Sequence, residues 1–217
     1  MHTNGNENAH EDEREHERVD DRDAALAVAI LAAGASRRLG QPKQLLRIGE
    51  DSLLQRAVDT AHTLGGGRVL LLLGAQADAC WASLRPGPNR DRTERVDVPD
   101  HAEGMSASVR AATSCLDGDP SIARMLVMLV DQYAVDIAWL RQLRALGAAY
   151  PQRMVASVHA GVRGAPAVFP RSEFPALRAL SGDFGARALL RARGDTVEFR
   201  APHAPGDIDT PDDLPSP

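Results

Sequence analysis

The residues best suited to chemistry lie in a loop of small side chains that follows an apolar segment, residues 26–33. The loop reads Gly34-Ala35-Ser36-Arg37-Arg38-Leu39-Gly40-Gln41-Pro42-Lys43. Small residues let backbone N–H groups close on a phosphate chain, and Arg38 and Lys43 would add cations for a triphosphate. The loop therefore predicts a nucleotide-phosphate site; a tight turn with solvated arginines is the alternative. It has neither the Gly-Lys-Ser/Thr of a Walker loop nor the Gly-x-Gly-x-x-Gly of dinucleotide folds, which disfavours ATPases and dehydrogenases.

Lys43 is the only lysine in the sequence, since 24 of the 25 residues counted as Lys or Arg are arginines. An ammonium is a compact charge on a flexible stem, whereas a guanidinium is a wide planar fork. This composition favours a specific phosphate contact at position 43, with compositional chance as the alternative.

Asp131 directly follows the most apolar segment of the chain, residues 125–130. A carboxylate that points into a crevice there loses hydration, and a bound cation would compensate for that loss. Helix capping is the alternative, although Asp136 is better placed to cap a helix beginning at Ile137. Asp131 is therefore a predicted metal ligand.

A second group of carboxylates lies near residue 210. Thr210, Pro211 and Asp213 have the pattern of a helix start, with Thr210 as the cap. Asp207 and Asp209 precede that cap, so they remain available to bind a metal.

Short apolar runs alternate with stretches of helical period from Leu26 onward, which is typical of a parallel sheet covered by helices. We predict an α/β fold: a Rossmann-like three-layer sandwich with a mostly parallel sheet of about seven strands and helices on both faces. The predicted strands are Leu26–Ala33, Arg68–Leu73, Arg95–Val98, Met125–Val130, Met154–Val158, Ala167–Phe169 and Val197–Arg200. The predicted helices are one capped by Ser52 and ended by Gly65, and others at Ala75–Leu84, Ser106–Cys115, Ile137–Ala149 and Phe184–Ala192. Ligands of such folds bind beyond the carboxyl ends of the strands, where Gly34 and Asp131 are expected.

Charge is unevenly distributed along the 217 residues, whose formal net charge is -5. Residues 1–23 contain nine Asp or Glu and three Arg, a net -6, which leaves +1 for the remainder. We expect a disordered acidic tail at 1–23 and a single domain at 24–217. A nearly neutral body with 4% aromatic residues disfavours nucleic-acid binding.

The sequence gives little indication of targeting to a membrane or of thiol chemistry. The longest apolar stretch, residues 24–35, is well short of the roughly 20 residues that span a bilayer, and no secretory signal is apparent at the start. We expect a cytoplasmic protein with no membrane partner. Cys80 and Cys115 fall in predicted helices and are expected to be reduced.

Six motifs in order resemble those of the molybdenum cofactor cytidylyltransferase family, over residues 26–214. They are Leu31-Ala32-Ala33-Gly34-Ala35-Ser36-Arg37-Arg38-Leu39-Gly40 with Lys43, Gly104-Met105-Ser106-Ala107-Ser108, Asp131-Gln132, Gly164-Ala165-Pro166, Ser181-Gly182-Asp183-Phe184-Gly185-Ala186-Arg187 and Asp207-Ile208-Asp209-Thr210-Pro211. Guanylyltransferase relatives usually have Gly where this chain has Ala33, so the resemblance implies CTP over GTP.

The resemblance implies roles for individual residues. Lys43, Arg38, Asp131 and Asp209 would be catalytic, with Asp131 and Asp209 holding Mg²⁺. Nucleotide binding is implied for Leu31, Ala32, Ala33, Gly34, Ser36 and Ser108. Acceptor contact is implied for Gly104, Met105, Gly182 and Asp183.

The implied reaction is Mg²⁺-dependent transfer of CMP from CTP, or of a nucleotide from another nucleoside triphosphate, to a small phosphate monoester. Molybdopterin is the implied acceptor and a molybdoenzyme the implied client. The sequence departs from the family pattern at Tyr133, Val98, His101 and near His159, which puts the acceptor in doubt more than the phosphate chemistry. The alternatives are a methylerythritol phosphate or sugar-1-phosphate nucleotidyltransferase, and a non-catalytic carrier of the molybdenum cofactor.

Overall fold

The computed structural model describes residues 26–36, 39–183, 185–208, 210 and 213. The predicted acidic tail, residues 1–23, lies outside these ranges. So do two predicted site residues, Arg38 and Asp209, and Pro211 of the predicted cap.

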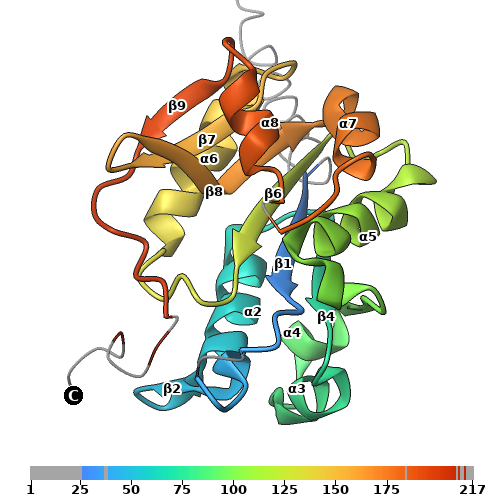
Figure 1. Cartoon of the computed structure of the whole chain (residues 1–217), viewed down its shortest axis with the longest axis vertical. Helices are drawn as coiled ribbons and strands as arrows, with labels where there is room; N and C mark the ends of the chain where they lie inside the picture. The colour runs from blue at the N-terminus through green and yellow to red at the C-terminus, as the bar shows by residue number, and fades with distance from the viewer. Residues whose placement is uncertain (1–25, 37–38, 184, 209, 211–212, 214–217) are drawn as a thin grey trace, which may run out of the picture.

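A seven-stranded sheet forms the centre of the described chain (Figure 1). Its strands lie in the order β5 (Thr93–Asp97), β4 (Arg68–Leu73), β1 (Leu26–Ala32), β6 (Arg124–Leu129), β8 (Val162–Pro170), β7 (Val155–His159) and β9 (Val197–Arg200). β8 is antiparallel to both of its neighbours, and the other pairs are parallel. The chain runs from β1 outward to β4 and β5 and then returns to β6, so the strand order reverses between β1 and β6. Ligand sites of α/β sheets lie at such a reversal.

Helices cover both faces of the sheet and give it two apolar layers (Figure 1). One layer holds α2 (Leu53–Leu64), α3 (Ala77–Ser83) and α6 (Ile137–Ala149), and the other holds α5 (Met105–Asp117), α7 (Phe174–Arg178) and α8 (Arg187–Ala192). Every residue of β1 is buried because its side chains alternate between the two layers. The predicted three-layer sandwich is confirmed.

Shorter elements connect these parts. They are the 3₁₀ turns η1 (Lys43–Leu45), η2 (His101–Glu103) and η3 (Arg171–Glu173), the hairpin of β2 (Arg47–Ile48) and β3 (Asp51–Ser52), and the helix α4 (Pro88–Asp91).

Two helix starts follow the predicted caps. The Ser52 hydroxyl accepts a hydrogen bond from Gln55 N at 3.1 Å, and the Asp136 carboxylate accepts one from Trp139 N at 2.8 Å. Thr210 N likewise donates to the Asp213 carboxylate at 2.7 Å, which is one half of a capping box.

Other boundaries differ from the prediction for local reasons. The helix expected from Phe184 begins at Arg187, since Gly185 has a φ of 54° that a helix cannot contain. β8 is longer than the expected Ala167–Phe169, because its pairing with β7 extends through Gly164 to Val162.

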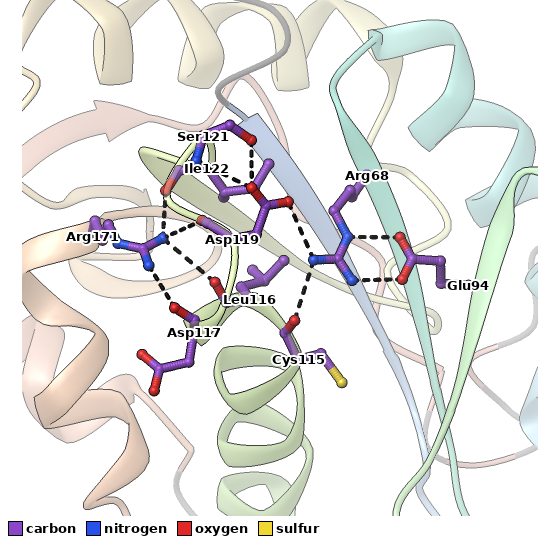
Figure 2. Close-up of polar contacts among 9 residues, drawn as sticks. All are labelled: Arg68, Glu94, Cys115, Leu116, Asp117, Asp119, Ser121, Ile122 and Arg171. Atoms are coloured by element: carbon purple, nitrogen blue, oxygen red, sulfur yellow. Dashed lines mark hydrogen bonds and ion pairs between the residues drawn. The ribbon is translucent and has the colours of Figure 1, made fainter.

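Two arginines, Arg68 and Arg171, form hydrogen bonds with the C-terminal end of α5, at the edge of the sheet where β1 and β6 begin (Figure 2). Arg171 donates to the carbonyls of Asp117, Asp119 and Ile122 at 2.7–2.9 Å and to that of Leu116 at 3.4 Å. Arg68 donates to the Cys115 carbonyl at 3.2 Å and forms a bidentate ion pair with Glu94. The hydrogen bonds to Glu94 raise the pKa of the Arg68 guanidinium. Positive charge at a helix C-terminus is favourable, so α5 has a fixed position at this end.

The thiols of Cys80 and Cys115 are free, as predicted. Within the described ranges, no helix has the length and apolar character needed to cross a membrane.

Candidate functional site

A cavity of about 460 Å³ lies beyond the carboxyl ends of β1 and β6, at the reversal of strand order. Four segments form its walls: the loop after β1 with the first residues of η1, the turn η2 with the start of α5, the residues that end β6, and the segment around Asp183. It is lined by Leu31, Ala33, Gly34, Ala35, Ser36, Leu39, Lys43, Gln44, His101, Ala102, Gly104, Met105, Ser108, Leu129, Val130, Asp131 and Asp183.

Ser36 sets the path of the loop after β1. Its φ is 50°, an uncommon value for a residue with a side chain, and its hydroxyl accepts a hydrogen bond from Lys43 N at 2.9 Å. The Ser36 carbonyl also accepts from Leu39 N at 3.0 Å. These bonds fold the loop back on itself and place Lys43 at the first position of η1, facing the cavity.

Lys43 joins three segments that are far apart in the sequence. Its ammonium donates to the Asp131 carboxylate beyond β6 and, at 3.3 Å, to the carbonyl of Ile208. The Asp131 and Lys43 side chains are 14% and 15% exposed, so this ion pair lies at the cavity wall rather than in open solvent. The predicted phosphate cation and a predicted metal ligand are therefore in direct contact.

The segment that carries Ile208 is held against the end of β6. Gln132 and Asp207 form an isolated antiparallel bridge, and Ala134 N donates to Pro205 O at 3.0 Å. Gly206 packs on the ring of Tyr133, where an added Cβ would lie 2.7 Å from the ring. The side chain of Ile208 is fully buried in the layer that contains α2 and α6.

The oxygen atoms around Lys43 have the chemistry that Mg²⁺ prefers. A carboxylate and a backbone carbonyl already hold one cation there, the ammonium itself. Among the described residues no three His, Cys, Asp or Glu side chains cluster as a metal site, and Asp209 lies outside them. The donor set near Asp131 fits a divalent cation that takes its other ligands from substrate and water.

The start of α5 and the segment around Asp183 form the opposite wall. Gly104, which has a φ of 107°, lies so close to the backbone of Asp183 that an added Cβ would be 2.6 Å from the Asp183 Cα atom. Ser106 N donates to the Gly182 carbonyl at 3.3 Å, and Arg110 donates to the Leu180 carbonyl at 3.0 Å. This packing holds Asp183 at the cavity, where its side chain is exposed.

The structure brings most of the predicted site residues to one cavity. Those that line it are Leu31, Ala33, Gly34, Ser36, Lys43, Gly104, Met105, Ser108, Asp131 and Asp183. Ala32 and Gly182 do not line it: Ala32 is buried at the end of β1, and Gly182 contributes its carbonyl to the α5 contact.

Sequence reasoning did not identify Gln44 and Ala102 as cavity residues, and it named His101 only as a departure from the family pattern that bears on the acceptor. Gln44 follows the lone lysine directly, and that adjacency was the available signal. His101 and Ala102 lie in η2, a short turn with no periodic pattern to indicate its position.

A family model described as a MobA-like NTP transferase domain matches residues 28–197. Among curated relatives, the nicotine blue oxidoreductase of Paenarthrobacter nicotinovorans is 31% identical over 193 residues, covering 83% of this chain and 90% of that protein. The purine catabolism protein PucB of Bacillus subtilis (strain 168) is 30% identical over 200 residues, covering 87% and 93%. A probable molybdenum cofactor guanylyltransferase of Opitutus terrae is 30% identical over 129 residues, covering 56% and 55%.

Two solved structures are similar to this chain over most of its length. Rv0371c from Mycobacterium tuberculosis H37Rv superposes with a TM-score of 0.77 at 33% identity, covering 88% of this chain and 95% of that one. A structure of Rv0371c in complex with manganese has a TM-score of 0.73 at 30% identity, covering 87% and 95%. The family match spans the strands that carry the cavity, from β1 to the first residue of β9. The chain therefore belongs to the family with a MobA-like NTP transferase domain, and it is a nucleotidyltransferase of that type.

Proposed function

We propose that this protein transfers CMP from CTP to the phosphate monoester of molybdopterin, with Mg²⁺ as its cofactor and pyrophosphate as the second product. The contact between Lys43 and Asp131 is the observation that carries this proposal. It brings a cation suited to a triphosphate and an oxygen ligand suited to a divalent metal to one point of the cavity. A carrier that only holds a finished cofactor has no need of that combination.

In the proposed reaction, an oxygen of the acceptor phosphate attacks the α-phosphorus of CTP. A new P–O bond forms, the bond from the α-phosphorus to the bridging oxygen breaks, and pyrophosphate leaves with the electron pair. Both reactants are anionic, so positioning and charge neutralisation dominate catalysis. A divalent metal, when bound, supplies further neutralisation of the phosphate charge.

The residues of the chain divide this work. Lys43 exchanges part of its contact with Asp131 for the triphosphate, and Arg38 is proposed as a second cation. Gly34 and Ala35, both exposed at the cavity, offer backbone close to the phosphates. Asp131, with Asp209 as its proposed partner, would hold the metal.

The preference for CTP is proposed from Ala33. Its methyl group lies at the cavity wall, and the residue is 5% exposed. Gly74 packs behind it, where an added Cβ would lie 2.3 Å from the Ala33 carbonyl oxygen, so the backbone at Ala33 has no room to retreat. A purine would need the space that this methyl group occupies, which supports CTP over GTP.

Three features support the proposed acceptor and its position. The resemblance of the motifs and the relative named a molybdenum cofactor guanylyltransferase both point to molybdopterin. The wall formed by Gly104, Met105 and Asp183 is a separate side of the same cavity, where a second substrate would approach the triphosphate.

The test is a panel of nucleotides and acceptors with purified protein and Mg²⁺ or Mn²⁺, read out as pyrophosphate. We expect release with CTP and molybdopterin, and CTP should exceed GTP in kcat/KM by at least about tenfold, roughly 1.4 kcal/mol. Equal use of GTP would remove the argument from Ala33. Release with methylerythritol phosphate or a sugar 1-phosphate, but not with molybdopterin, would reassign the acceptor.

A further inference from the structure

Gln44 is a buried residue whose side-chain amide contacts the loop after β1 (residues 33–36, the nucleotide loop). Its side chain is 2% exposed and comes from η1, immediately after Lys43. Its Nε2 atom donates to the Ala32 carbonyl at 2.6 Å and to the Gly34 carbonyl at 2.8 Å. One amide group thus holds two carbonyls on either side of Ala33.

These bonds fix the orientation of a short stretch of backbone. The carbonyls of Ala32 and Gly34 both point to Gln44, while the carbonyl of Ala33 between them packs against Gly74. Peptide groups are planar, so fixing the carbonyls also fixes the direction of the N–H groups of Ala33, Gly34 and Ala35. The loop is therefore oriented by the protein before any ligand binds.

The chemistry of this position requires an amide. Nε2 carries two N–H donors, and both are used on the two carbonyls. A rotated amide would place Oε1 against those same carbonyls, so the orientation follows from the acceptors. Oε1 itself is buried and has no hydrogen-bond partner among the described residues. A buried amide oxygen without a partner among the described residues is unfavourable for folding. This cost falls on a residue that lines the cavity, next to the loop after β1.

We propose that Gln44 is a positioning residue for the nucleotide. It holds the loop from Ala32 to Gly34 in the conformation that receives the triphosphate. It also keeps the methyl group of Ala33 beside the position proposed for the nucleobase. This inference rests on the proposed function, since it assumes that a nucleoside triphosphate binds in the cavity. Gln44 acts through the backbone and does not itself touch the reacting atoms.

The test compares Gln44→Met with Gln55→Met. Methionine has nearly the volume of glutamine but no N–H donor. Gln55 is also a buried glutamine, 6% exposed, and its amide donates to Asp59 at 3.0 Å and accepts from Arg85 N at 2.9 Å, away from the cavity. Both substitutions therefore remove amide hydrogen bonds from a buried site, and only one of those sites faces the nucleotide loop.

Three measurements are made on each protein: the melting temperature, the Kd for CTP and for GTP by calorimetry, and amide hydrogen exchange over residues 31–36. We expect Gln44→Met to raise the Kd for CTP by at least about tenfold, since misplacement of a positioned group near 1 Å has effects of that order. The ratio of the GTP and CTP Kd values should fall, and exchange at Ala33, Gly34 and Ala35 should accelerate. Gln55→Met should lower the melting temperature without any of these changes.

The outcomes separate this inference from the proposed function. Tight CTP binding by the wild-type protein and by Gln44→Met alike would overturn the role of Gln44 and leave the proposed function standing. If the wild-type protein binds no nucleoside triphosphate, the proposed function fails and the role of Gln44 fails with it. Should Gln44→Met be poorly folded, Gln44→Asn, which keeps a neutral amide but is one methylene too short to reach both carbonyls, is measured in the same way with Gln55→Asn as its control.

Discussion

The ammonium of Lys43 contacts the carboxylate of Asp131 although 88 residues separate them in the sequence. The two side chains come from the loop after β1 and the end of β6, which are neighbouring parallel strands, so both reach the same edge of the sheet. Without substrate each is the counter-ion of the other. A nucleotide and its metal would replace a contact that already exists, and this keeps two charges compensated in a partly buried wall.

The first prediction concerns the type of cation at position 43. Lys43→Arg keeps the charge but brings a planar fork on a different stem, so the charge should be misplaced relative to the triphosphate. We expect kcat/KM for CTP to fall by at least about tenfold with the melting temperature nearly unchanged. Arg47→Lys, a basic substitution at an exposed position of β2, is the control and should leave turnover unaffected. Wild-type turnover in Lys43→Arg would show that the single lysine is compositional chance.

The second prediction removes the charge of Asp131. Asp131→Asn keeps the shape of the side chain and loses the anionic ligand, so we expect turnover to fall at least about 10²-fold and binding of Mn²⁺ in the presence of CTP to weaken. Spin resonance of Mn²⁺ measures the second effect independently of activity. The control is Asp91→Asn in α4, an exposed carboxylate away from the cavity. Unchanged Mn²⁺ binding in Asp131→Asn would remove this residue from the metal site.

A third prediction follows from the free space at Gly34. A Cβ added at Gly34 would have no protein atom within 4 Å. The φ of Gly34 is also not in the positive range that residues with side chains rarely adopt. The fold itself therefore does not require glycine at position 34. If glycine is needed there, the reason would be that a ligand approaches the backbone closely. Gly34→Ala should keep or slightly raise the melting temperature and weaken CTP binding at least about tenfold.

Gly194→Ala is the matched control for that experiment. Gly194 also has open space around it and no unusual φ, but it lies between α8 and β9, away from the cavity. Gly194→Ala should leave CTP binding unchanged. It should change the melting temperature by the same small amount as Gly34→Ala. Equal CTP binding by Gly34→Ala and the wild type would contradict the phosphate role of this glycine.

The fourth prediction concerns stability alone. Arg171 donates to four carbonyls at the end of α5 and in the loop that follows, and a lysine cannot reproduce that planar arrangement. Arg171→Lys should lower the free energy of unfolding by about 1.5–3 kcal/mol, measured by urea denaturation. Arg178→Lys alters an ion pair with the exposed carboxylate of Asp117, and its effect should stay below about 1 kcal/mol. Equal losses in the two variants would show that the carbonyl contacts of Arg171 add nothing.

The fold was predictable because its signals are local. The apolar run of β1, the Ser52 cap and the Asp136 cap each act within a few residues, and each was found as predicted. The grouping of Gly34 with Asp131 was predictable as well, since both follow strands of one sheet. The antiparallel direction of β8 was not, because strand periodicity is the same in either direction.

The contacts that shape the site depend on distant partners. The amide of Gln44 is recognisable only when the carbonyls of Ala32 and Gly34 are seen to point toward it. The approach of Gly104 to Asp183 joins two segments nearly eighty residues apart, and nothing in either segment alone indicates it. The roles assigned to all of the site residues stay predictions, and two of these residues, Arg38 and Asp209, lie outside the described part of the chain.

The placement of Ile208 has a consequence for truncation. A chain shortened to end at Arg200 would still contain every strand of the seven-stranded sheet. It would lack the bridge between Gln132 and Asp207 and the carbonyl that helps to hold Lys43 beside Asp131. The residues that complete the cavity wall therefore lie outside the segment that forms the sheet, and removing them would take away part of the site and leave the sheet's own sequence intact.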